Sequence, residues 1–258
     1  SGHAWNRTKW GVWDYTEYLT LARPAFELGQ KYGAVLVGPA VIDFEFHLYP
    51  PLLKHLPFDK VSSLLYVDRV GAPENAQSGW TTSKKIALLK AFVDRSAGRP
   101  KDCWITEFNW PLEGTGKYSP ASGKPNVSEE AQADYLVRYY LLALAGGLIE
   151  RVYWWQLVAP GYGLVESREP AWRARPSYRA LRTLVEMLAG SEFTGGTIED
   201  GVHIFHFRKD GRRFAACWTA GEPVERDLGE PVVEIVDRDG ERSAAPSSPR
   251  LKIEGSPK

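Results

Sequence analysis

The chain has 258 residues, which suffices for one large domain or for a medium domain with a small appendage. Lysine plus arginine and aspartate plus glutamate both number 32, so no net charge points to nucleic acid or to a membrane surface. No apolar run reaches the roughly 18 residues of a membrane-spanning helix. Cys103 and Cys217 lie in strand-like runs and are expected to remain thiols. The first residues lack a signal-peptide pattern, which leaves the compartment open.

Helical and strand patterns alternate through the first three quarters of the chain. The predicted helices cover residues 14–32, 50–56, 84–96, 128–145 and 176–189. The predicted strands cover residues 34–45, 62–67, 102–110 and 152–158. Thr81 to Ser83 and Ser128 are suitable N-caps, and the cap explains Ser128 better than the glycosylation sequon that it completes. This alternation indicates βαβ units and a parallel sheet.

The pattern changes after Gly190 to short alternating runs with turn signals at Asp210-Gly211 and Asp239-Gly240. These runs predict a small antiparallel β domain over residues 191–258. The Ser- and Pro-rich end, residues 243–258, is expected to be partly disordered.

Four strands, with the end of a fifth before Asn6, are too few for a closed (β/α)₈ barrel, which needs eight. Residues 1–190 therefore form either an open α/β sheet or the C-terminal part of a (β/α)₈ TIM barrel, with strands four or five to eight. Carboxylate and aromatic residues cluster where the predicted strands end, which favours the partial barrel.

Glu107 is the residue around which this prediction is organised. Alternation puts Cys103, Ile105 and Glu107 on one face of their strand. A carboxylate in a strand buried on both faces is costly, so it needs partners or a function. The C-terminal end of a barrel strand is where catalytic groups lie.

The run Trp104-Ile-Thr-Glu-Phe-Asn-Trp110 resembles the seventh-strand motif of retaining glycoside hydrolases of clan A, above all the β-xylosidase and α-iduronidase group. The resemblance implies that Glu107 is the nucleophile. It also implies that Tyr66, in Leu64-Leu-Tyr66, lies beside the nucleophile, and that Tyr153-Trp-Trp155 supplies the aromatic floor of the sugar subsite. A small β domain after the barrel is frequent in this group.

The segment Asn6 to Trp10 resembles the residues that come after the fourth-strand Asn-Glu-Pro-Asn motif of the same families. Aligning that motif with His3 to Asn6 puts Ala4 where the proton-donating glutamate is expected. The resemblance therefore supports the fold more strongly than full activity.

Retaining glycosidases need a second carboxyl group about 5 Å from the nucleophile. Asp43 and Glu45 end the first predicted strand on one face, and Glu45 is the candidate; the alternative is that both form salt bridges near Arg69 or His47. The candidate substrate-binding residues are Asn6, Trp10, Asn109, Trp110, Trp154 and Trp155. Trp154 and Trp155 point to opposite faces, so at most one of them is the subsite floor.

Three other groups are weaker candidates. Glu150 precedes its strand and is expected to be a surface charge. Glu166 lies in a loop that we expect to be mobile. His203 and His206 lie on opposite faces of one strand, which argues against a metal pair. The sequence thus predicts neither a metal nor a cofactor.

The sequence favours a glycoside hydrolase that acts on β-linked sugars by a retaining mechanism, with Glu107, Tyr66 and Glu45 as catalytic residues. The expected partner is an oligosaccharide or glycoside, with no nucleic acid and no membrane, together with another chain or a missing N-terminal half that completes the barrel. One alternative is a carbohydrate-binding homologue that has lost hydrolysis. Another is an α/β protein unrelated to sugars, which an open sheet with Glu107 facing the helices would favour.

Overall fold

The computed structural model describes residues 15–67, 70–118, 125–168, 172–245 and 248–257. Its α-helices are α2 (Tyr15–Lys31), α3 (Tyr49–His55), α4 (Thr82–Ala97), α5 (Glu129–Ala145) and α6 (Pro176–Leu188), with short 3₁₀ helices η1 (Phe46–Leu48) and η2 (Gly116–Tyr118). The first strands are β1 (Val37–Ile42), β2 (Lys60–Leu64), β3 (Cys103–Phe108) and β4 (Arg151–Trp154). The remaining strands are β5 (Val165–Glu166), β6 (Arg173–Ala174), β7 (Glu192–Glu199), β8 (Val202–Lys209), β9 (Arg212–Thr219), β10 (Val224–Asp227), β11 (Glu234–Val236), β12 (Arg242–Ala244) and β13 (Arg250–Ile253).

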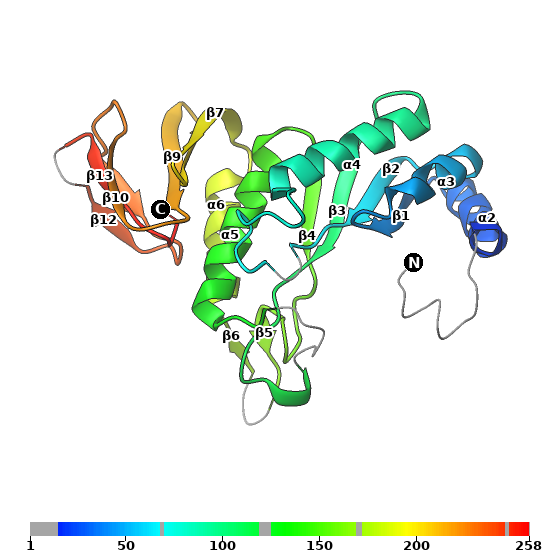
Figure 1. Ribbon diagram of the computed structural model, residues 1–258, viewed down its shortest axis with the longest axis horizontal. Helices are drawn as coiled ribbons and strands as arrows, with labels where there is room; N and C mark the ends of the chain where they lie inside the picture. Colours follow the sequence, from blue (N-terminus) through cyan, green and yellow to red (C-terminus); the bar gives the residue numbers. More distant parts are fainter. Residues whose placement is uncertain (1–14, 68–69, 119–124, 169–171, 246–247, 258) are drawn as a thin grey trace.

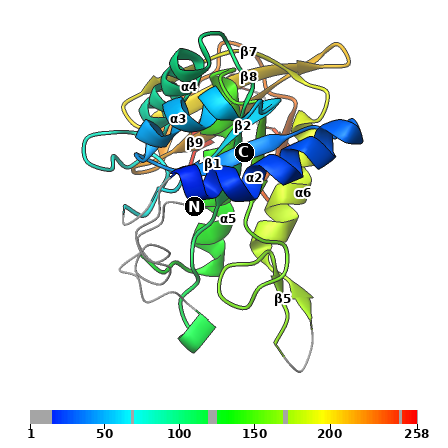
Figure 2. The same ribbon diagram turned by 90° about the vertical axis from the view of Figure 1, so that its right-hand side faces the viewer.

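Strands β1 to β4 form one parallel sheet in the order β1-β2-β3-β4. The predicted parallel sheet is thereby confirmed, and the fold is mixed α/β. Figure 1 shows α5 and α6 lying between this sheet and the antiparallel strands that follow α6. Figure 2 shows α2 and α3 at the β1 side of the sheet.

Helices cover one face of the parallel sheet. Val61 of β2, Ile105 of β3, Leu89 of α4 and Tyr139 of α5 are fully buried in the same apolar cluster. The other face is less covered: Tyr153 of β4 and the following Trp155 are 40% and 45% exposed. Trp104 of β3 contacts Tyr153 on that side. The sheet therefore has a helix-covered face and an aromatic, partly exposed face.

The helix starts follow the predicted caps. The side chain of Thr81 accepts a hydrogen bond from the Lys84 amide, and that of Ser128 accepts one from the Ala131 amide. Each hydroxyl satisfies a backbone donor that lacks a partner within its helix, which fixes where α4 and α5 begin. Both cysteines are buried free thiols, as predicted.

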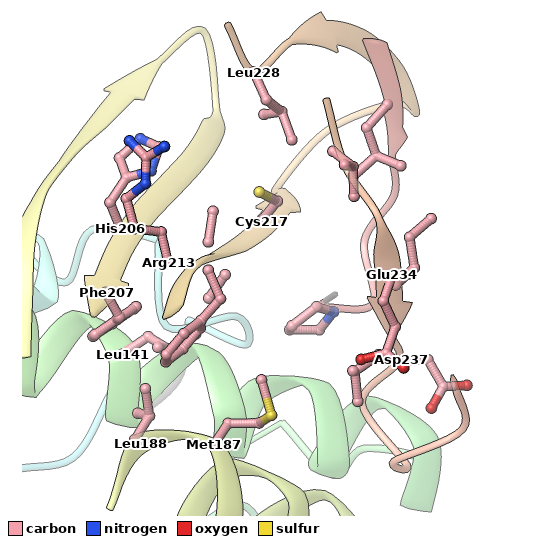
Figure 3. Close-up of a pocket in the computed structure, with 18 of the residues that line it drawn as sticks. Leu141, Met187, Leu188, His206, Phe207, Arg213, Cys217, Leu228, Glu234 and Asp237 are labelled. Atoms are coloured by element: carbon pink, nitrogen blue, oxygen red, sulfur yellow. The ribbon is translucent and has the colours of Figure 1, made fainter. Parts of the chain in front are cut away.

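The antiparallel strands after α6 are joined to it and to α5 by a second apolar cluster. Trp218 of β9 is fully buried there, and its indole N–H donates to Glu74 at 2.7 Å. A cavity of about 400 Å³ lies between α5, α6 and these strands, with Leu141, Met187 and Cys217 among its lining residues (Figure 3). The cavity is lined mainly by apolar side chains and shares no lining residue with the Glu107 region.

The predicted bounds of the first strand were wrong. Residues 34–36 are not part of β1, and the strand ends at Ile42 because Phe44 adopts a left-handed conformation (φ 65°) that turns the chain. Residues 250–253, within the segment that we expect to be partly disordered, form β13, which pairs with β10 and buries Leu251 and Ile253. Burial of these two apolar side chains stabilises a segment whose composition resembles a tail.

In the described part of the chain, no helix combines the length and apolarity needed to cross a membrane.

Candidate functional site

Glu107 and Tyr66 meet where two neighbouring parallel strands end. Glu107 is the next-to-last residue of β3, and Tyr66 follows β2 by two residues. The Tyr66 hydroxyl donates a hydrogen bond to Oε1 of Glu107, and both side chains are half-buried. The Leu65 amide also donates to the Glu107 carbonyl at 3.1 Å, which ties the two backbones together.

A β-bulge decides which face of β3 carries the carboxylate. Ser63 is opposite Ile105 and Leu64 is opposite Glu107, so Thr106 is an extra residue in the ladder. Ile105 and Phe108 both remain buried toward the helices, and Phe108 stacks on Tyr139 of α5. The prediction that Glu107 shares a face with Cys103 and Ile105 was therefore wrong, because the bulge interrupts the two-residue period. Glu107 lies on the face away from the helices.

The surroundings of Tyr66 keep its hydroxyl protonated. Burial, and then the neighbouring Glu107 carboxylate, raise the pKa of Tyr66 well above its ordinary value. The hydroxyl is thus a proton donor to Glu107 at neutral pH. Tyr162 also contributes to the raised pKa, so it lies close to the same pair.

Some of the aromatic candidates are packed in the core, and others are exposed at the surface. Trp154 packs against Phe108 and Trp110, and Trp110 is only 4% exposed with its indole N–H donating to the Gly71 carbonyl. Trp155, in contrast, is 45% exposed, and its carbonyl accepts a hydrogen bond from Nδ2 of Asn109 at 2.8 Å. Trp155 and Asn109 therefore lie beside the Glu107 strand end, while Trp110 and Trp154 belong to the core.

Asp43 and Glu45 do not end β1 on one face as predicted, because the turn at Phe44 separates them. Asp43 pairs with Lys85 at 2.5 Å rather than with His47. Glu45 is half-buried at the N-terminus of η1, and its assignment as the second catalytic carboxyl group stays a prediction. Ala4, Asn6, Arg7, Trp10, Asp68 and Arg69 lie outside the described residues.

The loop after β4 is held rigidly, which the sequence did not indicate. Glu166 is 6% exposed and pairs with Arg175, which is fully buried, at 2.7 Å. Arg175 also donates to the carbonyls of Ala159, Pro160 and Gly163 at 2.6–2.8 Å. The expectation of a mobile Glu166 was therefore wrong, because this network fixes the segment that carries Tyr162.

The arginines around Glu166 explain why its carboxyl group stays ionised. Hydrogen bonds from Arg168, and then the charge of Arg175, lower the pKa of Glu166 to about 2. Glu150 remains an exposed charge, as predicted: it pairs with Lys60 at 2.8 Å and accepts the Trp104 indole N–H.

The fold was compared with known proteins. No protein-family model matches the sequence, and no curated protein matches it. Among solved structures, the chain is similar to a family 39 glycoside hydrolase from Bacteroides cellulosilyticus WH2, with 18% identity, a TM-score of 0.60, and coverage of 80% of this chain and 45% of that chain. It is also similar to a GH30 endoxylanase from Clostridium papyrosolvens C71, with 13% identity, a TM-score of 0.60, and coverage of 95% and 60%. A GH51 arabinofuranosidase from Xanthomonas axonopodis pv. citri gives 13% identity, a TM-score of 0.52, and coverage of 74% and 45%.

The chain shares the fold of these glycoside hydrolases. It spans 45% to 60% of the length of the three structures. Of the two features expected of a protein unrelated to sugars, the described residues show an open four-stranded sheet, whereas Glu107 lies away from the helix layer instead of facing it.

Sequence reasoning missed two residues near Tyr66. Lys85 lies within α4 and reads as an ordinary helical lysine, so no local signal distinguishes it. Tyr162 stands in Gly161-Tyr-Gly163, and an aromatic residue between glycines in the loop after a strand is a signal that could have been used. Among the described side chains, no group of three or more His, Cys, Asp or Glu is arranged to hold a metal ion.

Proposed function

We propose that the chain is part of a glycoside hydrolase that acts on β-linked sugars by a retaining mechanism, with Glu107 as the nucleophile. The observation that carries this proposal is the Tyr66–Glu107 hydrogen bond where β2 and β3 end, beside the exposed Trp155. The fold shared with three glycoside hydrolases supports it, as does the resemblance of residues 104–110 to a seventh-strand motif.

In this mechanism an oxygen of Glu107 attacks the anomeric carbon while the bond from that carbon to the leaving oxygen breaks. A second carboxyl group gives its proton to the leaving oxygen, and a covalent glycosyl–enzyme ester forms. Water, deprotonated by the second carboxylate, then attacks the same carbon and releases Glu107. The net result is hydrolysis with retained configuration.

Tyr66 supports the first step by donating to Glu107, because this hydrogen bond holds the attacking carboxylate in one orientation. The exposed Trp155 offers an apolar surface on which a sugar ring can stack. Asn109, bonded to the Trp155 carbonyl, fixes the strand end that carries this indole.

We further propose that the parallel sheet is the C-terminal part of a (β/α)₈ barrel. In the described part of the chain β1 and β4 are the edge strands of this sheet, and the face with Trp104 and Tyr153 lacks a helix layer. Further strands would pair with these edges and enclose that face. Glu45 is our candidate for the second carboxyl group within this chain.

The proposal is tested by labelling the nucleophile. The protein is incubated with 2-deoxy-2-fluoro-β-glycosides of xylose and glucose, which form long-lived glycosyl–enzyme esters, and then digested for mass spectrometry. A sugar adduct on the peptide that contains Glu107 is the expected result. An adduct on a different carboxylate would overturn the assignment.

Turnover of aryl β-xylosides and β-glucosides gives the second measurement. Glu107→Gln is expected to lower kcat/KM by about 1,000-fold or more, because the amide cannot form the ester. Glu150→Gln is the matched control, since Glu150 is an exposed carboxylate that lies before β4. Unchanged turnover in Glu107→Gln would refute the nucleophile, and oligosaccharide binding without any hydrolysis by the native protein would indicate the carbohydrate-binding alternative.

A further inference from the structure

A buried ion pair contacts the backbone of Tyr66. Lys85 of α4 and Asp43, which follows β1, have side chains only 3% and 7% exposed, and their charged atoms are 2.5 Å apart. Neither residue contributes to the proposed chemistry directly. A buried ion pair is a weak source of stability, because removing two charges from water costs about as much as their attraction returns. This pair therefore calls for an explanation.

Three acceptors from the described residues bind the lysine ammonium. Its Nζ donates to Asp43 at 2.5 Å, to the Tyr66 carbonyl at 2.5 Å and to Oε1 of Gln77 at 2.7 Å. The ring of Phe44 lies over the same ammonium at 5.0 Å. These bonds hold the Lys85 ammonium in one place beside the Tyr66 backbone.

The pair holds both backbone polar groups of Tyr66. Lys85 binds the Tyr66 carbonyl, and Oδ1 of Asp43 accepts a hydrogen bond from the Tyr66 amide at 3.4 Å. Tyr66 lies past the end of β2, where the regular ladder no longer fixes its backbone. The ion pair supplies the missing restraints at this position.

We propose that Lys85 and Asp43 are positioning residues that set the Tyr66 hydroxyl against Glu107. The Lys85–Asp43 pair fixes the backbone of Tyr66, and the side chain then extends to the carboxylate. The effect of this placement on catalysis rests on the proposed function, whereas the placement of the Tyr66 hydroxyl itself does not. Placement of a catalytic side chain within a fraction of an ångström by surrounding residues is what such a site requires.

The geometric part is tested without turnover. In the native protein the Tyr66 hydroxyl proton is expected to give a slowly exchanging downfield proton NMR signal, identified by its loss in Tyr66→Phe. Lys85→Met is expected to shift or abolish this signal. Lys90→Met is the matched control: Lys90 lies on the same helix and pairs with Asp94 four residues away, at 2.6 Å. A Tyr66 signal that is unchanged in a folded Lys85→Met protein would overturn the proposal.

The catalytic part is tested by a double-mutant cycle. Lys85→Met is expected to lower kcat about 10-fold with little change in KM, while the same change in a Tyr66→Phe background lowers kcat less than about twofold. Full additivity of the two effects would refute action through Tyr66. If Lys85→Met does not fold, Asp43→Asn with Lys85→Met removes both charges together and takes its place in both measurements.

The outcomes separate the two proposals. If Glu107→Gln leaves turnover unchanged, the proposed function fails, and the hydroxyl signal still decides whether the Lys85–Asp43 pair positions Tyr66. If the Tyr66 hydroxyl signal is unchanged in Lys85→Met while Glu107→Gln abolishes turnover, the proposed function stands and the positioning role fails.

Discussion

The hydroxyl of Tyr66 donates a hydrogen bond to the carboxylate of Glu107, although 41 residues separate them in the chain. One follows β2 and the other ends β3, and parallel pairing of these strands brings the two side chains to the same edge and face of the sheet. This contact is the centre of the candidate site.

The contribution of this contact is measured with Tyr66→Phe. Removing the hydroxyl deletes one hydrogen bond to a charged group, which contributes about 1.5–3 kcal/mol. We expect kcat/KM for aryl β-glycosides to fall by about 10- to 100-fold with the protein still folded. Tyr178→Phe is the control, because Tyr178 is a partly exposed tyrosine of α6. Equal activity of Tyr66→Phe and the native protein would contradict the assignment.

Trp155 and Trp154 are adjacent but are expected to respond oppositely to substitution. Trp155→Ala removes an exposed indole and should weaken binding of xylo-oligosaccharides by about 10-fold in Kd with a small effect on stability. Trp154→Ala removes a packed indole and should lower the free energy of unfolding by about 3–5 kcal/mol. Titration calorimetry and urea unfolding measure the two quantities. A stability loss of similar size in both variants would show that Trp155 is not a surface residue.

The buried network after β4 predicts unequal effects for two arginines that share a partner. Glu129 pairs with both Arg175, which is fully buried, and Arg173, which is exposed. Arg175→Ala removes one donor from the buried Glu166 and one from each of three carbonyl groups, and we expect a loss of about 3–5 kcal/mol of unfolding free energy. Arg173→Ala should cost no more than about 1 kcal/mol. Chemical denaturation distinguishes these values, and equal losses would contradict the role given to the network.

His203 predicts a specific pH dependence of stability. It is 4% exposed and stacks on Trp218, and burial, followed by the charge of Arg138, lowers its pKa to about 4. The unfolded chain binds this proton near pH 6.5, so the contribution of His203 to stability is complete above that pH and is lost as the pH falls toward 4.

The substitution His203→Phe keeps an aromatic ring against Trp218 and removes the titration. Stability measured between pH 4 and 6.5 should then vary less with pH than in the native protein. His206→Gln is the control, because His206 is an exposed histidine on the same strand. A native-like profile in His203→Phe would show that His203 does not cause the dependence.

Periodicity and caps determined the elements from the sequence. Apolar runs bounded by glycine, with Ser128 and Thr81 as caps, predicted the four parallel strands and the helices between them, since these signals act within a few residues of the chain. The motif around Glu107 directed attention to the strand end where Tyr66 and Glu107 meet, and alternation correctly separated Trp154 from Trp155. These features depend on local spacing alone.

Tertiary structure decided the rest. The bulge at Thr106 reversed the face of Glu107, and the turn at Phe44 separated Asp43 from Glu45. The ion pair between Lys85 and Asp43 joins residues 42 positions apart, and the bond between Arg175 and the Gly163 carbonyl depends on packing of α6 against the loop after β4. Register shifts and long-range charge pairs are set by how whole elements pack, and the residues of one segment do not contain that information.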